Sequence, residues 1–96
     1  MPAYLVADIH EIHDTASYDA YRQHTPAAIA KFGGRFIVRG GRTESKEGDW
    51  KPHRLVVIEF PDMAAAQRFY GSPEYQKILP LRLKASRGRV LLVEGA

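Results

Sequence analysis

Residues 54–75 read RLVVIEFPDMAAAQRFYGSPEY, and this stretch decides the fold. The run from Arg54 to Phe60 is rich in apolar and β-branched residues until Pro61 ends it, which predicts a strand. Successive side chains of a strand point to opposite faces, so the four consecutive apolar residues Leu55–Ile58 make both faces of this strand apolar. Such a strand is typical of a sheet that is covered on both sides.

The second half of the stretch predicts two short helices. Asp62 can cap a helix over Met63–Tyr70, and Gly71 ends that helix. Ser72 can cap the next helix, which has Pro73 at the favoured first helical position.

Upstream of this stretch, the chain predicts a strand, a helix and a second strand. Ala3–His10 is β-rich and forms the first strand. A helix follows from an N-cap within residues 14–17, and we expect Pro26 to kink it or to break it. Gly33-Gly34 ends the helix, and Arg35–Arg39 forms the second strand.

Three further segments complete the prediction. Arg42–His53 is polar and predicts a loop or hairpin excursion. We expect Pro80 to interrupt the second short helix, with Leu81–Ser86 as a separate helical turn. Arg89–Glu94 predicts the last strand.

The element order β-α-β-β-α-β is that of a ferredoxin-like α+β fold with an antiparallel sheet. Its helices cover one face of the sheet, but the strands at Leu55–Ile58 and Val90–Val93 are apolar on both faces. A second copy of the same sheet is the simplest cover for the remaining face. The sequence therefore predicts a homodimer through the sheet face.

Length and composition narrow the function classes. The 96 residues fit a single domain over 1–96, and the lack of cysteine excludes disulfides and thiolate chemistry. We expect a cytoplasmic protein, because neither a signal peptide nor a run of about 20 apolar residues occurs. The net charge of +3 is dispersed and no aromatic RNA-binding strand motif is present, so no nucleic-acid partner is expected. No nucleotide fingerprint is present, and no cofactor is expected.

Several motifs together resemble a known family. They are GGRFIVRGG at 33–41, EGDW at 47–50, RLVVIEFPD at 54–62, FYGSPEY at 69–75 and the closing VEG at 93–95. In this order and spacing the chain resembles the domain of unknown function family 1330. The resemblance implies a dimeric α/β barrel, in which two ferredoxin-like subunits pair through their sheets. Relatives with this fold resemble cofactor-independent monooxygenases, isomerases and stress-induced proteins.

Asp8, His10 and Glu59 are the candidate catalytic residues. Asp8 and His10 are two apart on a strand and share a face, so the carboxylate could orient the imidazole as a general base. His10 and His13 form an H-x-x-H, but no third ligand is evident and no metal site is expected. Glu59 follows four apolar residues, and either pairs with Arg35 or Arg39 or acts as a pocket acid or base.

Arg39, Trp50, Arg54 and Tyr75 are the candidate ligand-binding residues. The two arginines could hold the carboxylate of an acidic ligand, and the Tyr75 hydroxyl could line a space between helices and sheet. Trp50 lies in the charged loop and could form a lid over a pocket or pack onto protein. Three functions stay open: small-molecule binding, a cofactor-independent isomerase or monooxygenase-like enzyme, and a purely structural or stress-related dimer.

Overall fold

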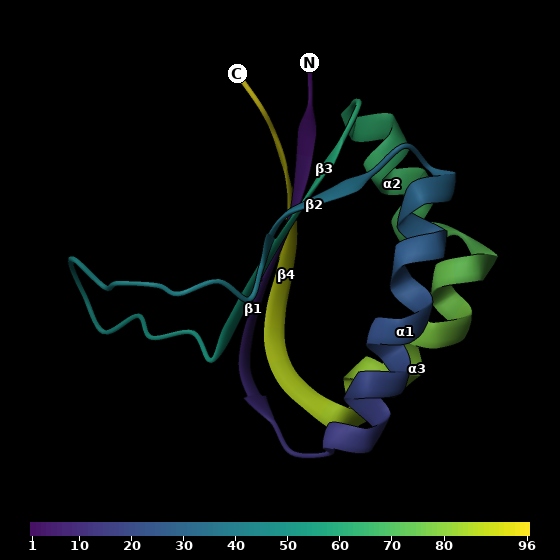
Figure 1. Cartoon of the computed structure of the whole chain (residues 1–96). Coiled ribbons are helices and arrows are strands. Elements are labelled where there is room, and N and C mark those ends of the chain that lie inside the picture. Colours follow the sequence, from purple (N-terminus) through teal and green to yellow (C-terminus); the bar gives the residue numbers. More distant parts are fainter.

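The computed structural model describes all of residues 1–96. One four-stranded sheet carries three helices on one side, and the β2–β3 loop projects on the other side (Figure 1). The elements in chain order are β1 (Ala3–Ile12), α1 (Thr15–Lys31), β2 (Arg35–Arg39), β3 (Arg54–Phe60), α2 (Met63–Gly71), α3 (Pro73–Ala85) and β4 (Ser86–Glu94).

The strands lie in the order β2-β3-β1-β4, and every neighbouring pair is antiparallel. This arrangement confirms the ferredoxin-like α+β fold. The two strands that are central in the sheet, β1 and β3, pair from Ala3 with Phe60 to Ile9 with Arg54. The strand that the sequence marked as apolar on both faces is therefore central, where both of its faces need cover.

The side chains of alternate residues in β1 point to opposite faces of the sheet. Leu5, Ala7 and Ile9 are buried under the helices in the main core, which also contains Phe60 and Phe69. The intervening residues of β1 point to the open face, on which no helix lies (Figure 1).

The open face is largely apolar. The register pairs Val6 with Val57 on one side and with Leu91 on the other, and Tyr4 with Val93. Leu91 is 57% exposed and Val93 is 43% exposed, which is unusual for adjacent apolar residues on a sheet. This face is the one that the sequence predicted to need a partner.

Helix α1 continues through Pro26, so the expected break is absent. Proline has no N–H, and the carbonyl of Arg22, four residues earlier, loses its usual helical partner. The hydroxyl of Thr25 donates to that carbonyl at 3.4 Å and replaces the missing bond. At the start of the helix, Asp14 accepts from the backbone N–H and the hydroxyl of Ser17, and these bonds lower the pKa of Asp14.

The second half of the chain forms its helices where the caps predicted them. Asp62 accepts from the Ala65 N–H at 2.8 Å, and Ser72 accepts from the Tyr75 N–H at 3.1 Å. The expected interruption at Pro80 was wrong, because α3 runs unbroken to Ala85. The face of α3 that packs on the core holds the helix together across the missing hydrogen bond.

Residues 40–53 contain no helix or strand, and they include the predicted loop Arg42–His53. The loop extends away from the helices (Figure 1). Each of the three helices is too short or too polar to cross a lipid bilayer.

Candidate functional site

A cavity lies between the helix-facing side of the sheet and the helices α1 and α3. Its volume is about 40 Å³, which is narrow beside the roughly 300–1,000 Å³ of typical ligand pockets. Most of its walls are apolar, with Leu5, Phe36, Ile58 and Phe69 among the lining residues.

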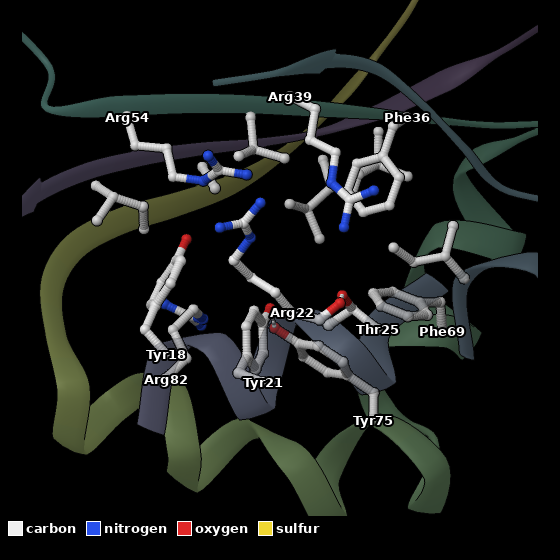
Figure 2. A pocket seen from close by; sticks show the side chains of 16 residues that line it. Tyr18, Tyr21, Arg22, Thr25, Phe36, Arg39, Arg54, Phe69, Tyr75 and Arg82 are labelled. Carbon is white, nitrogen blue, oxygen red and sulfur yellow. Dashed lines mark hydrogen bonds between the residues drawn. The ribbon is translucent and has the colours of Figure 1, made fainter. Parts of the chain in front are cut away.

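Four arginines line this mainly apolar cavity, and no acidic side chain does: Arg22, Arg39, Arg54 and Arg82. Arg39 comes from β2 and Arg54 from β3, whereas Arg22 reaches in from α1 and Arg82 from α3. Figure 2 shows the guanidinium groups of Arg22, Arg39 and Arg54 converging near the sheet. Positive charge is therefore concentrated where an apolar wall would usually be found.

An irregularity in β2 brings Arg39 into the cavity. Arg35 pairs with Glu59 and Phe36 with Ile58, but the next pairs join Val38 to Val57 and Arg39 to Val56. The additional residue between Phe36 and Val38 changes the alternation of faces. As a result Phe36 and Arg39, three residues apart, both line the cavity. The Arg39 guanidinium carbon lies 4.2 Å from the centre of the Phe36 ring.

Arg54 is held beside a glycine and has an unused hydrogen-bond donor. Its Nε is buried without a hydrogen-bond partner. Gly40 adopts φ +75°, and a Cβ at this position would lie 2.4 Å from Nη1 of Arg54. A larger residue here would strain the backbone and force this guanidinium to move.

The helix side of the cavity carries a pair of tyrosines. The hydroxyls of Tyr21 and Tyr75 are hydrogen bonded at 2.8 Å. Burial raises the pKa of Tyr21 well above its ordinary value, and the neighbouring Tyr75 raises it further. Both effects keep Tyr21 protonated, so this hydroxyl donates hydrogen bonds and does not act as a base.

Arg82 packs beside the tyrosine pair, with its guanidinium carbon 5.9 Å from the centre of the Tyr21 ring. Burial by itself lowers the pKa of Arg82, but Tyr75 and Tyr21 outweigh this effect and raise it. The guanidinium therefore stays charged although Arg82 is only 6% exposed.

A hollow at the surface adjoins the cavity. It shares Tyr18, Arg22 and Arg54 with the cavity, and its other lining residues include Asp19 and His53. Arg22 lies across the boundary, and its Nη1 is 3.7 Å from Asp19 Oδ1. The hollow thus borders the part of the cavity that holds Arg22 and Arg54.

The structure divides the predicted site residues between two faces of the sheet. Arg39, Arg54 and Tyr75 line the cavity. Asp8 and His10 share the open face, as their spacing predicted, and His10 Nε2 lies 3.6 Å from Asp8 Oδ2.

Trp50 and Arg89 complete the cluster around Asp8 on the open face. Asp8 Oδ2 accepts from the Trp50 indole N–H at 3.0 Å and from Arg89 Nη2 at 3.1 Å, while its Oδ1 is buried without a partner. The sheet therefore separates Asp8, His10 and Trp50 from the arginines, and Trp50 does not cover the cavity.

Glu59 also lies on the open face. It pairs with Arg35, with Oε1 2.9 Å from Nε and 2.8 Å from Nη2. Of the two partners considered from the sequence, Arg35 is the one in contact, because the irregularity in β2 turns Arg39 to the other side. Glu59 does not line the cavity.

The H-x-x-H residues do not converge. The ring of His13 bonds to the Lys84 carbonyl at 2.8 Å, away from the contact between His10 and Asp8. No group of three or more His, Asp or Glu side chains is placed to hold a metal ion.

A family comparison identifies the chain. The family described as "Domain of unknown function (DUF1330)" matches residues 2–96. The chain belongs to the DUF1330 family. No protein of curated function matches it.

Solved structures share the fold of this DUF1330 chain at low sequence identity. A protein of unknown function from Rhodopseudomonas palustris is 16% identical with a TM-score of 0.74, over 99% of this chain and 82% of that chain. A dimeric ferredoxin-like protein of unknown function from Jannaschia sp. CCS1 is 15% identical with a TM-score of 0.64, over 99% and 100%. SnoaB, a cofactor-independent oxygenase from Streptomyces nogalater, is 18% identical with a TM-score of 0.58, over 99% and 91%.

Sequence reasoning missed Arg22 and Arg82 as parts of one polar site in this DUF1330 protein. A signal was available in α1, where Tyr18, Arg22, Thr25 and Ile29 all lie on the face that lines the cavity. Arg22 occupies a position at which the helical spacing predicts a buried apolar residue. An arginine at such a position indicates a polar group inside the core.

Proposed function

We propose that this protein binds a small acidic molecule in the cavity between sheet and helices, with one such site in each subunit of a homodimer. The observation that carries the proposal is the set of four arginines in an apolar cavity that no carboxylate lines. Arg39, Arg54 and Tyr75 are the ligand-binding residues that the sequence had already indicated.

Electrostatics supports an anionic ligand. Three of the four arginines, Arg39, Arg54 and Arg82, form no ion pair, and Arg22 has only the long contact with Asp19. Arg82 is buried and Arg54 is partly buried, and charges withdrawn from water are costly unless they are paired. An unsatisfied buried donor costs about 1–3 kcal/mol. A bound carboxylate would pair these charges and accept from the free Nε of Arg54.

Binding is better supported than catalysis. The cavity lining contains no Asp, Glu or His, so no ordinary general base faces a bound molecule. Tyr21 is kept protonated by its raised pKa. The likeness to SnoaB extends to the fold, and fold alone does not carry the activity.

A cavity-filling variant tests the binding site. In ¹H–¹⁵N NMR titrations with benzoate, we expect saturable shifts at residues around the cavity, such as Thr25 and Val56. Ala7→Leu, which places a larger side chain in the cavity, should weaken this binding at least tenfold. Val6→Leu, one residue away on the open face, is the matched control and should bind as the parent does. The absence of saturable binding in the parent, or equal binding by Ala7→Leu, would refute this site.

Pairing through the open face is supported by its exposed apolar residues and by the dimeric neighbour from Jannaschia. Light scattering after size exclusion should give a dimer for the parent and a monomer for Leu91→Glu. Leu83→Glu is the matched control, because Leu83 is 60% exposed but lies on α3, away from the open face. A parent that is monomeric at micromolar concentration, or an unchanged Leu91→Glu dimer, would contradict the proposed interface.

A further inference from the structure

We infer that the ligand is a ring-bearing carboxylic acid with a second oxygen group, a hydroxyl or an oxo group, away from the carboxylate. This inference rests on the proposed function and names its ligand class. It follows from the two polar regions of the cavity, which lie on opposite sides: three arginines gather at the sheet, and a pair of tyrosine hydroxyls lies at the helices (Figure 2).

The region on the sheet side is cationic. Arg39 and Arg54 come from neighbouring strands, and the guanidinium of Arg22 points toward them from α1 (Figure 2). Guanidinium groups bind carboxylates through paired N–H donors, which gives both strength and direction. The free Nε of Arg54 supplies one donor that the protein itself does not use. The carboxylate of the ligand therefore belongs on this side.

The region on the helix side carries the hydroxyls of Tyr21 and Tyr75, with the guanidinium of Arg82 beside them. Tyr21 and Tyr75 share one hydrogen bond at 2.8 Å, which uses one of their two O–H donors. The second O–H is free to donate into the cavity, and both oxygens have lone pairs to accept. A neutral hydroxyl or oxo oxygen fits such a pair, because it can use the free donor without adding a second charge.

The walls between these regions suit a flat apolar body. Phe36, Ile58 and Phe69 line them, and Arg39 already stacks on the ring of Phe36 at 4.2 Å. Aromatic side chains pack well against the faces and edges of other rings. A ring that carries an oxygen at each of two positions matches this sequence of charged, apolar and hydroxyl surfaces.

Arg22 controls the space available to such a molecule. The cavity of about 40 Å³ is too narrow for a ring while this side chain lies within it. The side chain of Arg22 is 44% exposed, and its sole ion-pair partner, Asp19, lies at the surface hollow. We therefore assign Arg22 as the residue that moves aside for entry and then closes on the carboxylate.

Isothermal titration calorimetry with simple probes tests the ligand class. The probes are benzoate, 3-hydroxybenzoate, 4-hydroxybenzoate and 4-hydroxybenzyl alcohol, which lacks the carboxylate. At least one hydroxybenzoate should bind about tenfold more tightly than benzoate, which corresponds to one added hydrogen bond. The neutral alcohol should bind more weakly than benzoate.

Variants separate the two polar regions. In Tyr21→Phe/Tyr75→Phe, the preference for the hydroxybenzoate over benzoate should disappear while benzoate binding is retained. In Arg54→Gln, both acids should lose about tenfold or more in affinity. Arg42→Gln is the matched control, since Arg42 lies in the loop with its side chain 88% exposed.

The outcomes distinguish the ligand class from the proposed function. Equal affinity for benzoate and both hydroxybenzoates, or a preference that survives in the double tyrosine variant, would overturn the two-region ligand and leave acid binding in place. Tighter binding of the neutral alcohol than of the acids would overturn the proposal that the ligand is acidic. It would also overturn the assignment of the carboxylate to the arginines. Failure of every probe to bind would overturn the ligand class together with the proposed binding function.

Discussion

The indole N–H of Trp50 donates to the carboxylate of Asp8 at 3.0 Å, which joins residues 42 apart in the sequence. Trp50 lies in the β2–β3 loop, whereas Asp8 lies on the open face of a central strand. The bond therefore anchors an otherwise irregular 14-residue segment, 40–53, to the sheet.

Trp50→Phe should release this loop without affecting the cavity. The variant keeps an aromatic ring but loses the donor to a buried carboxylate, which should cost about 1–3 kcal/mol of unfolding free energy. Urea denaturation measures this loss, and hydrogen exchange should become faster in residues 42–53. Lys51→Ala, at an exposed neighbouring position, should change neither quantity. Unchanged exchange in Trp50→Phe would show that the indole bond does not hold the loop.

The two glycines Gly40 and Gly48 provide a matched test of the Arg54 position. Both have positive φ, +75° and +77°, so alanine should cost each about 1 kcal/mol through backbone strain alone. Only at Gly40 would the new Cβ meet the guanidinium of Arg54. Gly40→Ala should therefore weaken benzoate binding in NMR titration, whereas Gly48→Ala should not. Equal binding by the two variants would argue against a role for Arg54 in holding the acid.

The bond from Thr25 to the Arg22 carbonyl predicts energetic coupling with Pro26. In the parent, Thr25→Val should cost about 1 kcal/mol, because the carbonyl loses the donor that replaces the missing N–H. In a Pro26→Ala background the alanine N–H can bond to that carbonyl, and Thr25→Val should cost clearly less. A double-mutant cycle in urea measures the coupling. Additive effects would show that the hydroxyl does not compensate for the proline.

The raised pKa of Tyr21 predicts a loss of stability in alkali. The folded protein holds this proton more tightly than the unfolded chain, whose tyrosine has a pKa near the ordinary 10.0. The protonated Tyr21 therefore makes its full contribution to the free energy of unfolding below about pH 10. This contribution is lost as the pH rises above 10, by up to about 1.4 kcal/mol per pH unit. Urea denaturation between pH 9 and 11 measures this slope. Tyr21→Phe should make the slope shallower, and a slope that does not change would contradict the assignment.

Much of the fold was predictable because its signals are local. Asp62 and Ser72 cap helices through their own side chains, and the apolar run at Leu55–Ile58 identified a central strand with two apolar faces. The predictions of helix breaks at the prolines were less successful, because the effect of a proline depends on tertiary packing and on neighbouring hydroxyl groups. Thr25 compensates for Pro26 within α1, and the continuity of α3 past Pro80 rests on contacts with residues distant in sequence.

The candidate site was less predictable because the sequence does not determine which face each strand residue occupies. Alternation placed Asp8 and His10 together, but it could not tell whether their face was the covered or the open one. Because of the irregularity after Phe36, Arg39 points into the cavity, and Arg35 remains on the face where it pairs with Glu59. Arg22 and Arg82 belong to two different helices, so their meeting with the strand arginines depends on tertiary packing.

The alternation along β1 gives the cavity and the proposed dimer interface interleaved residues of one strand. Substitutions one position apart should consequently produce unrelated phenotypes in a mutational scan. Changes at Leu5, Ala7 and Ile9 would alter ligand preference, and changes at Tyr4 and Val6 would alter subunit pairing. The proposed ligand site and the proposed interface can therefore change independently of each other in evolution.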